Sequence, residues 1–172
     1  MRGTFDLGVF YKKEDDSKMV GYTDSNYAGD IDDRKSTSGS IFMMSSEAIC
    51  WSLKKQLIVT LSTTKAEFVA AVAACSCQAI WLRKILEILN QKQPGTTVIY
   101  CDNMSTIKLS KNPVLHGRSK HIDVRFHFLR DFCKEGTIEL NFCRSDEQIT
   151  DLFTKPLKQS LFEKLRRKMG CA

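Results

Sequence analysis

Four acidic side chains are the residues of this sequence best suited to chemistry: Asp24, Glu67, Asp102 and Asp151. Asp24 lies in a segment rich in Val, Tyr and Thr, where aspartate is rare because its short side chain competes for backbone hydrogen bonds. Carboxylates that converge without cations repel one another. A cluster of this kind therefore predicts hard divalent ions, and Mg²⁺ or Mn²⁺ fits best. Two such ions about 4 Å apart are the usual arrangement for in-line cleavage of a phosphodiester.

Each acid also has a structural interpretation that the residues alone leave open. These are a strand end for Asp24, a capping box begun by Thr64 for Glu67, an N-cap for Asp102, and a solvated first-turn position for Asp151. The polar run that holds Asp30, Asp32 and Asp33 contains rival metal ligands, but its composition favours a solvated turn.

The elements that must position the four acids indicate an α/β domain. Strands are predicted at 8–11, around Asp24, and at 41–44, 48–53, 97–101 and 137–143, with an antiparallel meander over the first half. Helices are predicted at 64–90, 103–111, 122–133, from 145 into 151, and at 157–169. The long helix between two strands is typical of a parallel crossover. The acids can then meet over the carboxyl edge of one sheet, where open α/β folds hold their sites.

Composition predicts one globular domain that spans residues 1–172. The chain is 42% hydrophobic and 27% charged, its net charge is +6, and its pI is about 8.9, which is compatible with a polyanionic partner. Its seven cysteines are scattered and mostly flanked by apolar residues, as reduced thiols are. Because it has neither a signal peptide nor a bilayer-spanning run, we expect an intracellular protein, cytoplasmic or nuclear, with no membrane partner.

Two further groups of residues have competing interpretations. The densest basic cluster, Arg118, Lys120, His121 and Arg125, can contact the phosphates of a nucleic acid or can belong to a solvated loop and helix start. Trp51 and Trp81 are expected in the core rather than as platforms for stacked bases.

Five segments together, 21–39, 61–67, 100–103, 118–123 and 150–156, resemble the ribonuclease H domain of copia-type retrotransposon polyproteins. The resemblance runs in order over nearly the whole chain. It implies a ribonuclease H-like fold, with a five-stranded mixed sheet flanked by helices, and cleavage of the RNA strand of an RNA–DNA hybrid. It also implies two Mg²⁺ ions, with Mn²⁺ as a substitute. Asp24 would bridge both ions, Glu67 and Asp102 would complete one site, and Asp151 would complete the other.

Some features depart from the family pattern. The segment 143–151 has no histidine, although many ribonucleases H carry one in the loop before the last aspartate, and Lys65 stands where relatives often have an acid. Residues 1–18 resemble the connection that follows the polymerase, so the reverse transcriptase and integrase of a parent polyprotein are expected partners that this chain does not contain. The alternative function is therefore a catalytically silent remnant that binds nucleic acid or a protein.

Overall fold

The computed structural model describes residues 7–11, 18–111 and 120–171, and for residues 75–77 and 120–126 it describes only the backbone. Arg118 and most of the predicted connection 1–18 therefore lie outside the described residues. Within the described parts of the chain, no helix combines the length and the apolar character needed to cross a bilayer.

The described residues contain the predicted five-stranded mixed sheet. Its strands are β1 (Met19–Asn26), β2 (Thr37–Met44), β3 (Glu47–Lys55), β4 (Thr97–Cys101) and β5 (Ile138–Phe142), in the spatial order β3-β2-β1-β4-β5. β1, β2 and β3 pair antiparallel, which confirms the meander, whereas β4 pairs parallel with β1 and with β5. Because β1 and β4 run in the same direction, their carboxyl ends lie at one edge of the sheet.

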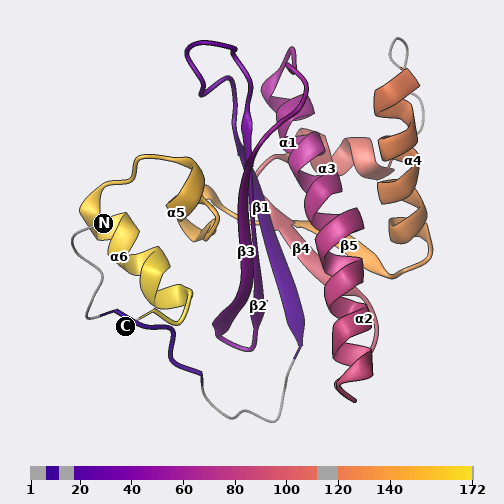
Figure 1. Cartoon of the computed structure of the whole chain (residues 1–172), viewed down its shortest axis with the longest axis vertical. Coiled ribbons are helices and arrows are strands. Elements are labelled where there is room, and N and C mark those ends of the chain that lie inside the picture. The colour runs from indigo at the N-terminus through magenta and orange to yellow at the C-terminus, as the bar shows by residue number, and fades with distance from the viewer. Residues whose placement is uncertain (1–6, 12–17, 112–119, 172) are drawn as a thin grey trace.

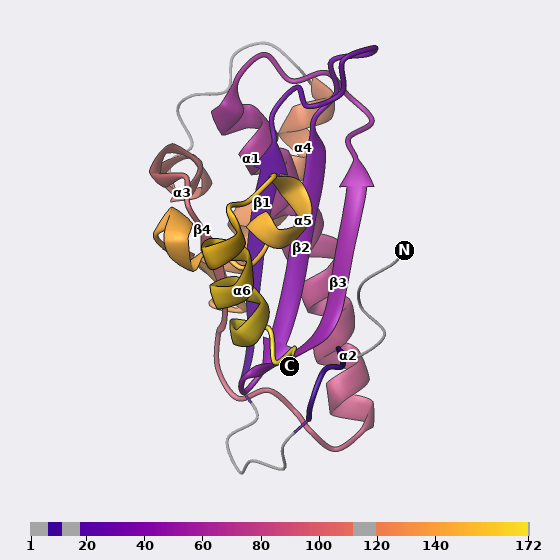
Figure 2. The same ribbon diagram turned by 90° about the vertical axis from the view of Figure 1, so that its left-hand side faces the viewer.

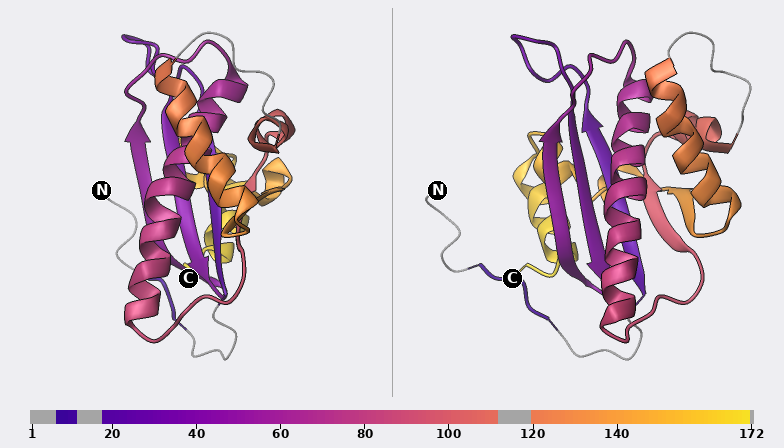
Figure 3. Two further views of the ribbon diagram at one scale, coloured as in Figure 1. Left: turned by 90° about the vertical axis from the view of Figure 1, so that its right-hand side faces the viewer. Right: turned by 45° about the vertical axis from the view of Figure 1, so that its right-hand side comes forward.

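Helices cover both faces of this sheet. α1 (Thr63–Val72), η1 (Ala73–Ala79) and α2 (Ile80–Ile88) form one long rod along one face, and α4 (Lys120–Lys134) packs beside it (Figures 1 and 3). α5 (Asp151–Thr154) and α6 (Gln159–Lys168) lie on the opposite face (Figure 2), while α3 (Met104–Lys111) contacts α1 and α4. The fold is thus a three-layer sandwich with the catalytic candidates at one end of the sheet.

Apolar periodicity explains the rod. Phe68, Ala71, Val72, Leu82 and Leu86 are buried against the sheet. The backbone stays right-handed helical at both junctions of the seven-residue η1 segment, which is a π-helix, so the predicted single helix is confirmed with a change of pitch in its middle.

Several expectations about individual elements are wrong. Residues 8–11 form no strand beyond a single antiparallel bridge between Val9 and Cys171. The segment from Ser145 forms a 3-10 turn, η2 (Ser145–Glu147), and α5 begins separately at Asp151, because the backbone of Gln148 is extended (φ −76°, ψ 97°). Trp51 lies on the edge strand β3 and Trp81 on α2, and they are 53% and 52% exposed, so neither is a core residue.

The close approach of α5 to the sheet depends on Gly39 in β2. A Cβ atom at this position would lie 2.7 Å from the methyl carbons of both Thr150 and Thr154, which are short, stiff side chains. We expect Gly39→Ala to push α5 outward and to lower the free energy of unfolding by about 1–3 kcal/mol. Urea denaturation measures this loss, and Gly8→Ala is the control, because nothing lies within 4 Å of a Cβ at Gly8. Equal stability of the two variants would contradict the prediction.

Candidate metal centre

Asp24 and Asp102 meet because β1 and β4 are parallel neighbours. The register pairs Tyr22 with Tyr100, and each acid follows two residues later. Asp24 is fully buried and pairs opposite Gly39 within β1, which continues to Asn26, so the strand-end interpretation is wrong. The cost of a buried carboxylate in a strand is offset by side chains that reach over from α5 and the residue after it.

Glu67 faces β1 rather than its own helix. The N-cap of α1 is Ser62, whose hydroxyl accepts a hydrogen bond from the Lys65 amide at 3.3 Å, so the capping box from Thr64 does not form. Oε1 of Glu67 instead accepts a hydrogen bond from the Ser25 amide at 3.1 Å. Oε2 is buried and has no hydrogen-bond partner among the described residues, which leaves it available to a ligand.

Asp102 is not a helix cap, and Asp151 is not a solvated first-turn residue. The cap of α3 is Asn103, whose Oδ1 accepts from the Thr106 amide at 3.0 Å, while Oδ2 of Asp102 accepts from the Ser145 hydroxyl at 3.3 Å. Asp151 is indeed in the first turn of α5, but it is only 3% exposed and is not solvated.

The structure brings the four predicted acids together. One ligand oxygen from each of Asp24, Asp102 and Asp151 lies within 4.8 Å of the others, and the same holds for Glu67, Asp102 and the thiol of Cys101. Asp102 belongs to both groups, so in this geometry it links the Glu67 side of the cluster to the Asp151 side.

A lysine ammonium lies among these carboxylates. Nζ of Lys155 is 2.9 Å from Oδ1 of Asp151, 3.0 Å from Oδ1 of Asp24 and 3.6 Å from Oδ2 of Asp102. The Thr154 hydroxyl donates to the other oxygen of Asp24. One cation therefore balances part of the charge of three acids.

Electrostatics at the cluster shift several pKa values. Burial raises the pKa of Glu67 to about 9, and the charges of Asp24 and Asp102 add to this effect. Burial likewise raises the pKa of Asp151 to about 6, although its hydrogen bond from Lys155 opposes the shift. Burial alone would lower the pKa of Lys155, but Asp24 and Asp151 outweigh it, and the net pKa is raised. The raised pKa of Glu67 favours its protonated form, and the raised pKa of Lys155 favours its ammonium form.

Thr154, Lys155 and Cys101 also contact or adjoin the acid cluster, although their sequence positions alone did not predict it. The available signal for Lys155 was its position four residues after Asp151, which places both side chains on one face of a helical turn. Cys101 precedes Asp102 at the end of a buried strand, and nothing in its sequence context distinguishes it from a core thiol.

The predicted phosphate contacts stay a prediction. Lys120, His121 and Arg125 lie in α4, where only their backbone is described, and Arg118 lies outside the described residues. The rival acids behave as expected for a turn, because Oδ1 of Asp30 accepts hydrogen bonds from the amides of Asp32 and Asp33, and Lys55 pairs with Asp30 and Asp33.

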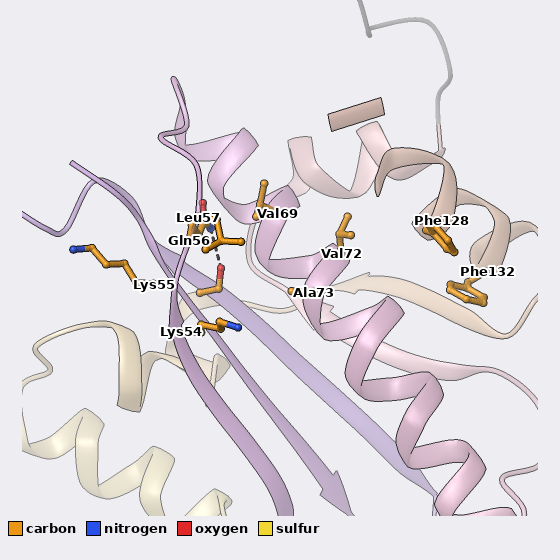
Figure 4. A pocket seen from close by; sticks show the side chains of 10 residues that line it. Lys54, Lys55, Gln56, Leu57, Val69, Val72, Ala73, Phe128 and Phe132 are labelled. Carbon is orange, nitrogen blue, oxygen red and sulfur yellow. Dashed lines mark hydrogen bonds between the residues drawn. The ribbon is translucent and has the colours of Figure 1, made fainter. Parts of the chain in front are cut away.

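One pocket of the described residues is separate from the acids. It has a volume of about 450 Å³ and lies between the end of β3, α1 and α4, with Leu57, Val69, Val72 and Phe128 in its lining (Figure 4). Gln56 lies at its edge and donates hydrogen bonds to Ser38 and to the carbonyl of Ala66. The four acids are not among its described lining residues, so this pocket and the acid cluster are different places on the molecule.

The donor set fits hard divalent ions. The described ligands are carboxylate oxygens with one neighbouring thiol, and oxygen donors are those that Mg²⁺ and Mn²⁺ prefer. The unpartnered Oε2 of Glu67 and the ammonium among the other acids both indicate a site that favours positive charge.

Sequence comparison finds relatives of this chain among retrotransposon polyproteins. The chain is 41% identical over 155 residues to the retrovirus-related Pol polyprotein from transposon TNT 1-94 of Nicotiana tabacum, and 38% identical over 170 residues to that from transposon RE2 of Arabidopsis thaliana. These matches cover 90% and 99% of the chain but only 12% of each polyprotein. The chain matches no family model.

Solved structures show the same fold at low sequence identity. LC11-RNase H1, solved in complex with an RNA/DNA hybrid, aligns with a TM-score of 0.52 at 11% identity over 76% of this chain and 88% of its own. The N-terminal RNase H domain of a Mycobacterium tuberculosis protein aligns with a TM-score of 0.53 at 10% identity over 88% of this chain and 97% of its own.

Proposed function

Because this chain is homologous to one region of the Pol polyproteins of copia-type retrotransposons and has the ribonuclease H fold, we propose that it is a metal-dependent endonuclease that cleaves the RNA strand of RNA–DNA hybrids. The observation that carries this proposal is the convergence of four carboxylates from β1, α1, the end of β4 and α5. Such a cluster costs stability unless cations bind it, so it supports a function that uses them.

In the proposed reaction Asp24, Glu67, Asp102 and Asp151 would hold two Mg²⁺ ions, which Mn²⁺ could replace. When bound, such ions activate water and stabilise the charge of the leaving oxygen. The chain fixes these ligands through hydrogen bonds: the Ser25 amide orients Glu67, the Ser145 hydroxyl orients Asp102, and the Thr154 hydroxyl orients Asp24. Hydrogen bonds of this kind fix the orientation of metal ligands and strengthen them.

The proposed substrate is recognised by shape. The RNA/DNA hybrid is the ligand of LC11-RNase H1, and the shared fold supports the same class of substrate here. A protein that contacts phosphates and 2′-hydroxyl groups binds a hybrid without reading its base sequence. Arg118, Lys120, His121 and Arg125 are the residues we assign to these phosphate contacts, and the other regions of a parent polyprotein are proposed partners.

A cleavage assay tests the proposed function. Labelled RNA–DNA hybrid, single-stranded RNA and duplex RNA are each incubated with the chain in Mg²⁺, in Mn²⁺ and in chelator. We expect cleavage of the hybrid's RNA strand in either metal and none in chelator. Cleavage that persists in chelator, or that is equal on all three substrates, would contradict the proposal.

The second candidate function is a silent module that binds nucleic acid. Two observations favour it, namely the ammonium of Lys155 among the acids and the absence of histidine from 143–151. This candidate predicts hybrid binding with no cleavage in Mg²⁺ or Mn²⁺, and the same assay distinguishes it.

The basic cluster gives a prediction that does not depend on cleavage. Each phosphate contact releases counterions, so replacing Arg118, Lys120 and Arg125 by Ala should reduce the slope of log affinity against log salt by up to about three units. Fluorescence anisotropy with labelled hybrid in chelator measures the slope. Replacing the exposed Lys84, Lys92 and Lys134 by Ala removes the same charge elsewhere and is the control. Equal slopes in the two triple variants would show that the basic cluster does not contact phosphates and would favour the solvated-loop interpretation.

A further inference from the structure

Lys155 takes a central position in the acid cluster. Its ammonium is within 3.0 Å of one oxygen of Asp24 and one of Asp151, and within 3.6 Å of Asp102. These are the same three acids whose oxygens lie close enough together to hold one ion. The ammonium therefore uses the oxygens that a divalent ion would need.

The backbone around Lys155 leaves its side chain free to withdraw. α5 ends at Thr154, and Lys155 itself is extended, with φ −132° and ψ 145°, immediately before Pro156. Its amide is anchored to the carbonyl of Asp151 at 3.1 Å, but its side chain is 35% exposed, whereas the side chain of Asp24 is fully buried. Rotation about side-chain bonds can thus bring the ammonium into water without moving α5 or the carboxylates.

An ammonium and a divalent ion exclude each other at this position. Two unit charges about 4 Å apart interact strongly even at the effective dielectric of a protein surface, and a divalent ion doubles the repulsion. The oxygens of Asp24 and Asp151 that accept from Nζ are also unavailable as ligands while those hydrogen bonds persist. Metal binding to this group requires the side chain to leave.

We propose that Lys155 is an internal counter-ion that holds Asp24, Asp102 and Asp151 together in the metal-free protein and is displaced when a divalent ion binds. This inference rests on the proposed function for the identity of the site. Lys155 is thus a positioning residue that keeps the ligands in place before the metal arrives and competes with the metal for them.

Because the ammonium competes with the divalent ion, removing Lys155 should increase the affinity for the ion. A ligand that binds only the state with the lysine withdrawn has an apparent Kd equal to its intrinsic Kd divided by the population of that state. If the ammonium fills the site about nine-tenths of the time, its removal tightens the apparent affinity about tenfold. A merely structural ion pair predicts the opposite, because its loss would disorder the ligands and weaken metal binding.

The test uses Lys155→Met, which keeps most of the aliphatic stem, and Lys158→Met as the matched control, since Lys158 is exposed three residues away. Mn²⁺ is titrated into each metal-free protein by isothermal calorimetry, and thermal midpoints are measured in chelator. We expect Lys155→Met to bind Mn²⁺ about tenfold more tightly than the wild type. We also expect it to melt at a lower temperature in chelator, while the control matches the wild type in both measurements.

Mn²⁺ affinity of Lys155→Met that is equal to or weaker than that of the wild type overturns the inference and leaves the proposed function intact. If neither protein binds Mn²⁺, both proposals fail. A second measurement covers the case in which Lys155→Met does not fold. In ¹⁵N-labelled wild type the Lys155 ammonium signal, assigned by its loss in Lys155→Arg, should vanish when Mg²⁺ is added, because a displaced ammonium exchanges its protons with water. A signal that persists in saturating Mg²⁺ overturns the inference.

Discussion

Asp24→Asn is expected to reduce cleavage of RNA–DNA hybrid by more than about a hundredfold, because even the outer partners of a metal ligand cost 10–100-fold when they are lost. Asp24 is the most buried of the four acids and lies beside both α5 and the end of β4. An amide keeps the shape of the side chain but loses the charge that attracts a divalent ion. The rate is measured on labelled hybrid in excess Mg²⁺.

The matched control is Asp131→Asn, which makes the same chemical change at an exposed position on α4. Asp131→Asn should cleave as the wild type does. Hybrid affinity in chelator should be similar in all three proteins, since Asp24 is assigned to the ions and not to the substrate. Cleavage by Asp24→Asn within a few-fold of wild type would exclude Asp24 from the reaction.

Glu67→Gln should remove most of the pH dependence of stability in the metal-free protein. The folded-state pKa of Glu67 is raised to about 9 from 4.5, mainly by burial, so the native state binds a proton that the unfolded state releases above pH 4.5. Its stabilising effect is complete below pH 4.5 and is lost as the pH rises toward 9. Each pH unit in this window costs about 1.4 kcal/mol, which gives up to about 3 kcal/mol between pH 6 and pH 8.

Urea denaturation in chelator at pH 6 and pH 8 measures this effect. Glutamine cannot ionise and can still accept the hydrogen bond of the Ser25 amide, so the variant should be nearly independent of pH and more stable than the wild type at pH 8. The exposed Glu135→Gln is the control and should retain the wild-type pH dependence. A pH profile of Glu67→Gln that parallels the wild type would show that Glu67 is not the buried acid that titrates.

Excess Mg²⁺ should reverse the sign of this stability difference at pH 8. Ions that bind only the native state stabilise it by mass action, and Glu67 is a proposed ligand, so the wild type should gain more from Mg²⁺ than Glu67→Gln. If both proteins gain equally, Glu67 does not bind the ion.

The sequence by itself determined the sheet, the rod and the identity of the four acids. Local patterns are sufficient for these features. The spacing of apolar residues along a strand such as β1, or along the helical rod from α1 to α2, predicts which of its residues are buried. The resemblance to the ribonuclease H domain rests on the order of the motif segments along the chain, and this order can be read without knowing which segments are in contact. Local composition predicted two short segments less well. Residues 8–11 have the composition of a strand but form only one bridge, and residues 145–148 have the composition of a capped helix but form a 3-10 turn.

Only the tertiary structure decided what each acid contacts. Glu67 stands three residues after Thr64 whether or not it caps its helix, and the choice is made by the Ser25 amide, 42 residues away in β1. Lys155 is likewise unremarkable in the sequence, yet the 3D fold brings it to Asp24, 131 residues away. Charge and hydrogen-bond partners at such separations depend on how the strands and helices pack, and no local pattern encodes them. The sequence therefore named the four acids, and the fold placed the Lys155 ammonium among three of them.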